Sequence, residues 1–275
     1  MKKNLIPTLL FLLLTARLFA QIGLDIVVED NKNGLTIISS KGSAKKLEIP
    51  ETIDGKPITV IGPAAFSQKG LEELKIPDSV TFIADGAFSY NQLSVLHIGD
   101  KVAAIGQGAF TGNKLTILTL GSSVEKIGKG AFSDNLISTV EFQEGLASIG
   151  DYAFFNNKIK EIKFPASLTF IGEGAFSGNK LDSVEIGPGV TKVKDGAFYN
   201  NMIASIVLPE SLESLGKRAF DMRPPDGRIK GSIDYTDTSG KILYTSANNF
   251  DTFYTFNGKK PGKYVMEEGE WGFGK

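Results

Sequence analysis

His97 is the only histidine in the chain, so a serine–histidine–aspartate arrangement would have to use it. Leu96 and Ile98 flank it in an alternating pattern, and this pattern places His97 on the outer side of a strand. Its neighbours in the adjoining strands would be Lys75 and Thr119, neither of which can orient an imidazole as a carboxylate does. The sequence also lacks a G-x-S-x-G motif. We therefore expect His97 to be an exposed surface residue.

Carboxylate-pair catalysis requires two acids about 5 to 10 Å apart, and Glu141 and Glu161 on adjacent strands could approach that closely. However, Glu141, Lys163 and Glu185 form a column of alternating charge, and we expect cross-strand pairing that stabilises the face. The Gly-x-Gly triplets at 106, 128 and 172 lack the lysine–serine ending of a phosphate loop. The absence of cysteine excludes thiol catalysis and cysteine metal sites. We expect no catalytic residue, metal or cofactor.

These residues belong to a repeat marked by an Ala-Phe pair that recurs every 22 residues. An aliphatic residue lies five positions before each phenylalanine, another lies three positions earlier, and an L-x-x-L-x-L segment follows. Such in-phase columns indicate stacked units whose equivalent positions lie over one another. The eight phenylalanines are Phe66, Phe88, Phe110, Phe132, Phe154, Phe176, Phe198 and Phe220.

The alternation in the L-x-x-L-x-L segment predicts one strand in each unit. Strands about 4.8 Å apart would bring the phenylalanines into an offset stack. An asparagine follows the phenylalanine by three positions, and asparagine tolerates left-handed backbone and bonds nearby main chain. We expect a buried structural ladder of Asn91, Asn113, Asn135, Asn157, Asn179 and Asn201.

The motif I-G-x-G-A-F-x-x-N-x-L-x-x-V-x-I resembles the BspA-like, or treponemal-class, bacterial leucine-rich repeat. The resemblance implies a mainly β, right-handed leucine-rich-repeat solenoid in a bacterial surface or secreted protein. It also implies an adhesin-like role, since members often bind host proteins or other bacteria. Two terminal units depart from the motif, because Lys69 replaces the asparagine and Lys217-Arg218 replaces the Gly-x-Gly pattern. Terminal units diverge because they face water.

The first twenty residues are typical of a signal peptide. Lys2 and Lys3 precede an apolar core from Leu5 to Leu14, and Ala20 offers a cleavage site before Gln21. This core is too short to span a bilayer, which requires about 20 residues. We expect an exported protein of the cell surface, periplasm or medium, with no transmembrane segment after cleavage. Without a cysteine, it cannot be a lipoprotein.

The remaining chain divides into three parts. Residues 21–44 read as an N-terminal β-hairpin cap, and residues 45–223 hold the eight repeats. Residues 224–275 are rich in aromatic residues and form a β C-terminal cap or module. Within it, residues 253–256 and 264–266 suggest a hairpin.

With net charge −1, nothing favours a nucleic-acid partner. The outward positions of the strands instead offer one extended face to a protein or glycan. We predict a non-catalytic binding protein; the alternatives are a structural envelope protein without a soluble ligand, or a C-terminal module displayed on the array that binds a ligand or acts as an enzyme. The candidate binding residues are Val95, His97, Ile117, Thr119, Thr139, Glu141, Glu161, Lys163 and Glu185.

Overall fold

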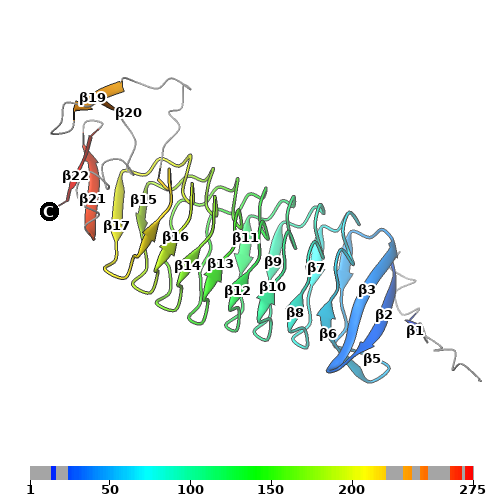
Figure 1. The fold of residues 1–275 in the computed structure, drawn as a ribbon. Coiled ribbons are helices and arrows are strands. Elements are labelled where there is room, and N and C mark those ends of the chain that lie inside the picture. The colour runs from blue at the N-terminus through cyan, green and yellow to red at the C-terminus, as the bar shows by residue number, and fades with distance from the viewer. Residues whose placement is uncertain are drawn as a thin grey trace, which may run out of the picture.

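The computed structural model describes residues 14–16, 24–220, 232–236, 242–246, 261–267 and 270–274. Within these ranges the chain is mainly β and contains no helix. Figure 1 shows an elongated stack of similar turns. Parallel partners lie 22 positions apart, as in Ile105↔Ile127. The prediction of a mainly β solenoid built on 22-residue units is confirmed.

No helix in the described ranges has the length and apolar character needed to cross a membrane.

The first row of strands contains the predicted L-x-L segments. Each central residue is more buried than its two neighbours, as in β9, where Leu96 is buried and Val95 and His97 are exposed. Three pairs of neighbouring strands in this row are in parallel register, for example Leu96↔Leu118, whereas residues 73–75 and 95–97 do not pair. The row comprises β4 (Lys46–Glu48), β7 (Glu73–Lys75), β9 (Val95–His97), β11 (Ile117–Thr119), β15 (Ser183–Glu185) and β17 (Ser205–Leu208).

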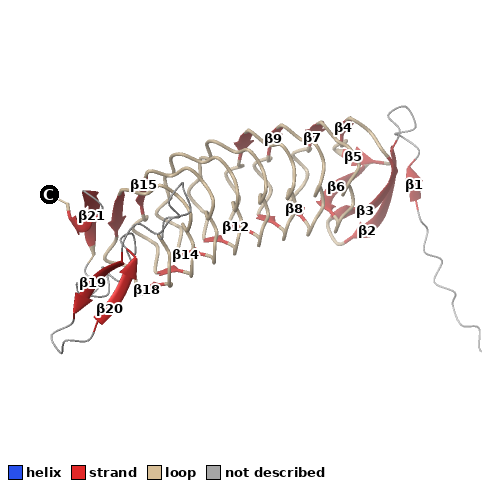
Figure 2. Ribbon diagram, turned by 90° about the horizontal axis from the view of Figure 1, so that it is seen from above, coloured by secondary structure: helices blue, strands red, loops and turns tan. Residues whose placement is uncertain are grey.

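A second row of parallel strands runs along the opposite side of the stack (Figure 2), and the sequence analysis missed it. Seven of its members have only two residues, too few to show alternation. Their aliphatic residues are those five positions before each phenylalanine. The row comprises β6 (Lys56–Ile61), β8 (Phe82–Ile83), β10 (Ala104–Ile105), β12 (Lys126–Ile127), β13 (Ser148–Ile149), β14 (Phe170–Ile171), β16 (Lys192–Val193) and β18 (Ser214–Leu215).

The glycine after these short strands permits close stacking of the units. A Cβ on Gly128 would lie 2.6 Å from the carbonyl carbon of Gly106 in the preceding unit. The Gly128 amide donates to the Ile105 carbonyl at 2.8 Å. A Cβ at Gly128 would force these backbones to shift, which accounts for glycine at most positions of this column, although Ala84 and Lys194 occupy it in two units.

The phenylalanine column forms the centre of the core. All eight rings are fully buried. Successive rings stack with centroids 5.1 to 5.5 Å apart and interplanar angles of at most 19°. Each such contact adds about 0.5–1.5 kcal/mol to the effect of burial. The column therefore holds every unit to the next.

The asparagine column ties neighbouring units together through the main chain. The side-chain amide of Asn135 donates to the Phe132 carbonyl at 3.1 Å and to the Phe110 carbonyl, one unit earlier, at 3.0 Å. Its Oδ1 atom accepts the Leu115 amide at 3.0 Å. The left-handed backbone belongs to the residue before each asparagine, as in Asp134 with φ 55°. Our expectation that asparagine itself supplies that conformation was therefore wrong.

At the N-terminal end, the stack carries an antiparallel hairpin. β2 (Leu24–Asn31) pairs with β3 (Gly34–Gly42), and β3 continues in parallel with β6. β5 (Thr52–Ile53) turns back on β6. β1 (Leu14–Ala16), inside the predicted signal peptide, pairs antiparallel with β2. The rest of that peptide, residues 1–13 and 17–20, lies outside the described residues.

A second hairpin adjoins the other end of the first row. β21 (Gly262–Glu267) pairs antiparallel with β17 and with β22 (Glu270–Phe273). β19 (Ser232–Thr236) and β20 (Ile242–Ser246) form a separate pair. Residues 253–256, the expected partner of 264–266, lie outside the described residues. The array thus passes from parallel to antiparallel pairing at both ends.

Candidate functional site

The candidate residues of the early repeats lie side by side on the first row. β9 and β11 pair so that Val95 lies beside Ile117 and His97 beside Thr119. Val95 is 39% exposed and Ile117 is 53% exposed. His97 and Thr119 are also exposed. We call the outward residues of this row the sheet face. It includes the equivalent positions in residues 139–141 and 161–163.

The first row is interrupted at two places, between β7 and β9 and again in its middle. Residues 139–141 and 161–163 form no strand, and only an isolated bridge joins Ile117 to Thr139. On either side of the interruption, the amide of Ile98 donates to the Thr119 carbonyl and that of Ile186 to the Val207 carbonyl, both at 2.9 Å. In the part of the chain that the structure describes, the equivalent amides of Leu120, Phe142 and Phe164 make no such bond.

Two aromatic residues occupy one apolar column at the middle interruption. Other units carry isoleucine or leucine at this position, whereas these two carry Phe142 and Phe164. Their rings stack with centroids 6.1 Å apart, wider than the spacing of about 4.8 Å between paired strands. Phe142 also makes an edge-to-face contact with Phe154, with ring centroids 5.6 Å apart. Phe164 makes the same kind of contact with Phe176, with centroids 5.7 Å apart. The two larger rings therefore lie in the same units as the unpaired segments.

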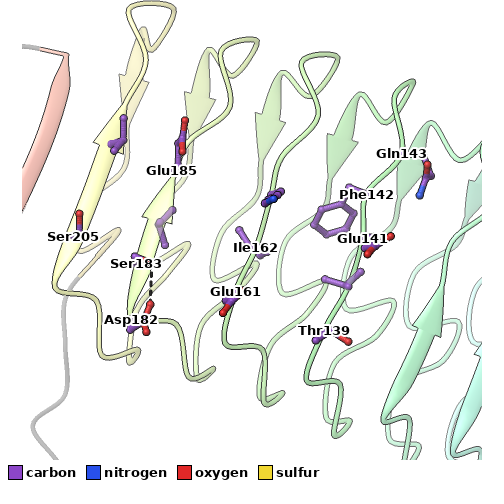
Figure 3. Close-up of a pocket in the computed structure, with 14 residues that line it drawn as sticks. Thr139, Glu141, Phe142, Gln143, Glu161, Ile162, Asp182, Ser183, Glu185 and Ser205 are labelled. Atoms are coloured by element: carbon purple, nitrogen blue, oxygen red, sulfur yellow. Dashed lines mark hydrogen bonds between the residues drawn. The ribbon is translucent and has the colours of Figure 1, made fainter.

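A groove of about 810 Å³ lies where the pairing is lost (Figure 3). Its apolar floor includes Val140, Phe142, Ile162 and Val184, of which Phe142 and Ile162 remain partly exposed. The structure brings five of the nine candidate residues together here, whereas Val95, His97, Ile117 and Thr119 lie outside it. Those five are Thr139, Glu141, Glu161, Lys163 and Glu185, joined by the further lining residues Gln143, Asp182, Ser183, Ser205 and Val207.

The charged residues of the groove are not paired with one another. Lys163 has no carboxylate within 4.0 Å among the described residues, so the expected pairing of Glu141, Lys163 and Glu185 was wrong. The physical reason is that residues 139–141 and 161–163 form no strand, so no paired register aligns their side chains. With Glu161 and Asp182, the groove holds four carboxylates and one ammonium group.

The early repeats behave differently, because regular pairing brings opposite charges together there. Lys46 lies 2.8 Å from Glu73, and Lys75 lies 2.6 Å from Glu48. The hydrogen bond from Lys75 lowers the pKa of Glu48, and the positive charge of Lys75 adds to this effect. Cross-strand ion pairs therefore form on this face only where the ladder is intact.

Sequence reasoning missed Asp182, Ser183 and the groove itself. The available signal was the departure of Phe142 and Phe164 from an aliphatic column. A second signal was Gln143, which stands where most units place proline or glycine after the strand.

A smaller hollow of about 220 Å³ lies between Tyr152 and Tyr199. Tyr152 Oη donates a hydrogen bond to Glu173 Oε1, and this bond raises the pKa of Tyr152, with burial adding to the shift. The Arg218 guanidinium lies 4.7 Å from the centroid of the Tyr199 ring. These contacts link neighbouring units and contain no paired nucleophile and base.

No group of three metal-ligating side chains occurs within the described ranges. His97 contacts no carboxylate there and stands on the open sheet face. The geometry of the described residues therefore offers a binding surface and no assembled catalytic arrangement.

The repeat matches a known family. The family model for the BspA type leucine rich repeat region matches residues 59–181 and 104–224, in 6 copies. No curated protein matches the chain.

Three solved structures resemble the chain in fold. A leucine-rich repeat protein of T. pallidum is 23% identical, with 74% of this chain and 89% of that chain covered, at a TM-score of 0.49. A leucine rich cell surface protein of Faecalibacterium prausnitzii is 22% identical, with coverage of 72% and 73% and a TM-score of 0.45. The pneumococcal vaccine antigen PcpA is 16% identical, with coverage of 71% and 76% and a TM-score of 0.48.

Proposed function

Because the chain belongs to the BspA type leucine rich repeat family, we propose that it is an exported bacterial protein that binds a protein or glycan partner through its sheet face. The observation that carries the proposal is the groove of about 810 Å³ on that face. A hollow with an apolar floor and converging polar groups is the usual form of a binding site. The role is adhesin-like and needs no catalysis.

The surface beside the groove extends this binding area. Val95 and Ile117 expose aliphatic side chains in the middle of the early repeats. Thr119 and Thr139 adjoin them with small side chains. Protein interfaces combine such an apolar centre with a polar rim. The groove and this patch together offer a continuous surface of mixed character along the array.

Export is part of the proposal and rests on the leader-like sequence. The residues that carry it are Lys2, Lys3 and the apolar run from Leu5 to Leu14. On intact cells, added protease should degrade the protein if it reaches the outer surface. Complete protection on intact cells, with degradation after the outer layer is opened, would instead place it in the periplasm.

Binding through the sheet face is tested by Val95→Lys combined with Ile117→Lys. Purified wild-type and variant chains are applied to panels of immobilised extracellular proteins and glycans. A bound partner should be lost from the variant, because two lysines would have to be desolvated in the interface. Met202→Lys is the matched control, since Met202 is 59% exposed and lies off the sheet face.

The use of this face would be contradicted if wild type, the double lysine variant and Met202→Lys all captured the partner equally, and if substitutions in the groove also left capture unchanged. A structural envelope protein without a soluble ligand would capture only further copies of itself. A ligand held by the C-terminal module would be captured equally by wild type and by every sheet-face variant.

A further inference from the structure

We propose that the groove binds a cationic peptide segment, a stretch of a partner protein that carries lysine or arginine side chains. This inference rests on the proposed function, since it specifies the partner of the sheet face. Three independent features of the groove support it: its unpaired charge, its unpaired main chain and its partly exposed apolar floor.

The charge of the groove favours a positive partner. Glu141, Glu161, Asp182 and Glu185 surround it, and Lys163 is its single cation. On the same face, the acids of the early repeats each have a lysine, as in Lys46–Glu73. The groove acids have none within the described residues. A ligand with ammonium or guanidinium groups would supply the cations that the chain itself supplies elsewhere.

The main chain of the groove is also unpaired. The amides of residues 161 to 164 make no hydrogen bond to another described residue, although these residues occupy the position of a strand. The adjacent β15 pairs only with β17 and leaves its other edge open to the groove. A peptide that crosses the units can bond these free amides with its carbonyl groups as it passes each segment, without forming a strand of its own.

The floor accommodates the long stems of basic residues. Phe142 and Ile162 are only half-buried, whereas the equivalent Ile98 and Leu96 in another unit are 4% and 0% exposed. Lysine and arginine cover apolar surface with their methylene groups while their charges remain at the rim. A neutral glycan would leave the four carboxylates without counter-charge.

The size of the groove fits a short segment. Thr139, Glu161, Ser183 and Ser205 occupy one column, so the groove crosses four units, or about 15 Å at the usual spacing of strands. An extended peptide covers this length with about four or five residues. A segment of that length can carry two or three basic side chains.

The test measures binding of fluorescein-labelled hexalysine to the full chain by fluorescence anisotropy, with labelled hexaglutamine as the uncharged control peptide. Glu161→Gln combined with Glu185→Gln should weaken hexalysine binding about tenfold. Lys163→Gln should strengthen it several-fold, because it removes the one competing cation. Glu125→Gln combined with Glu213→Gln removes the same charge elsewhere on the array and should leave binding unchanged.

Two results would overturn the proposal. Chitohexaose serves as a second probe, tested on wild type, Thr139→Lys and Ser183→Lys. If wild type binds chitohexaose but not hexalysine, and either lysine substitution abolishes the binding, the groove is assigned to a glycan. In that case sheet-face binding stands and only the cationic partner is wrong. If the groove variant and the control variant weaken hexalysine binding equally, the peptide is attracted by the net charge of the protein and not by the groove.

Discussion

The rings of Phe142 and Phe164 lie 6.1 Å apart, whereas Phe198 and Phe220 in the central column lie 5.1 Å apart. The two pairs are both close to coplanar, with interplanar angles of 8° and 0°. The wider pair lies beneath the interrupted part of the sheet face. We expect the two rings to keep the surface above them unpaired, and this connection can be tested directly.

Replacing both residues by the isoleucine of other units should close the groove. In Phe142→Ile combined with Phe164→Ile, residues 139–142 and 161–164 should pair with their neighbours, because the side chains match the ladder elsewhere. Hydrogen exchange of these amides should slow by at least tenfold, since they would acquire hydrogen bonds. Hexalysine binding should weaken in the same variant, because the groove that binds the peptide would be closed.

The control for this experiment is Ile98→Phe, which places the larger ring under the intact pair of β9 and β11. Exchange should accelerate there. If hydrogen exchange at residues 139–142 and 161–164 is unchanged in the isoleucine variant, the groove does not depend on the two aromatic rings.

Removal of one ladder asparagine should destabilise the stack markedly. Asn135→Ala leaves the Leu115 amide and the Phe110 and Phe132 carbonyls without their partner in a buried region. We expect a loss of about 3 kcal/mol in the free energy of unfolding, because each orphaned buried group costs about 1–3 kcal/mol. Urea unfolding followed by circular dichroism measures this loss.

Leu136→Ala provides the comparison for Asn135→Ala, since Leu136 is the next residue and is 44% exposed. It should change the unfolding midpoint little. Similar effects of the two substitutions would show that the asparagine bonds contribute no more than exposed packing.

Truncation of a ring in the central column should cost still more. Phe132 is fully buried between Phe110 and Phe154, with centroids 5.5 and 5.3 Å away. Phe132→Ala should lower the free energy of unfolding by about 4 kcal/mol, because it leaves a cavity inside the stack. Phe82→Ala is the matched control, since Phe82 is 37% exposed on the second row. Equal losses would contradict a structural role specific to the column.

The hydrogen bond between Tyr152 and Glu173 predicts a dependence of stability on alkaline pH. The bond raises the pKa of Tyr152 in the folded chain, so the folded state keeps this proton at a pH where the unfolded chain has lost it. The stabilisation is complete below the unfolded pKa of about 10 and is lost as the pH rises through the folded pKa.

Urea midpoints of wild type and Tyr152→Phe between pH 9 and about 11.5 test this dependence. The two chains should differ most at pH 9 and converge as the pH rises. Tyr90→Phe is the control, because Tyr90 is 60% exposed and makes no such side-chain bond within the described residues. A constant difference between wild type and Tyr152→Phe over the whole range would contradict the assignment.

The sequence predicts the parts of this fold that depend on repetition. The phenylalanine and asparagine columns stand out because identical positions must carry identical side chains when units stack by translation. The second row of strands could not be predicted in this way. A two-residue strand such as Ile127 with Lys126 has no alternation to read, and its pairing depends on the close approach that Gly128 allows.

The groove depends on exceptions to the repeat and was only partly predictable. The outward positions of Glu141, Glu161 and Glu185 follow from alternation, and they do line the groove. Their lack of ion pairs does not follow from alternation, because alternation cannot show that residues 139–141 and 161–163 form no strand. A pattern that describes average units cannot show how two unusual neighbours change the spacing between them.

The two ends of the array have a consequence for its length. In the second row every internal junction is a parallel pair of equivalent strands, whereas antiparallel pairing joins β2 to β3 at one end of the array and β21 to β17 at the other. Duplication of one whole unit therefore creates no new kind of junction and adds about 4.8 Å of reach. Molecules of this type can become longer or shorter by genetic recombination in steps of one turn, with both terminal pieces reused unchanged.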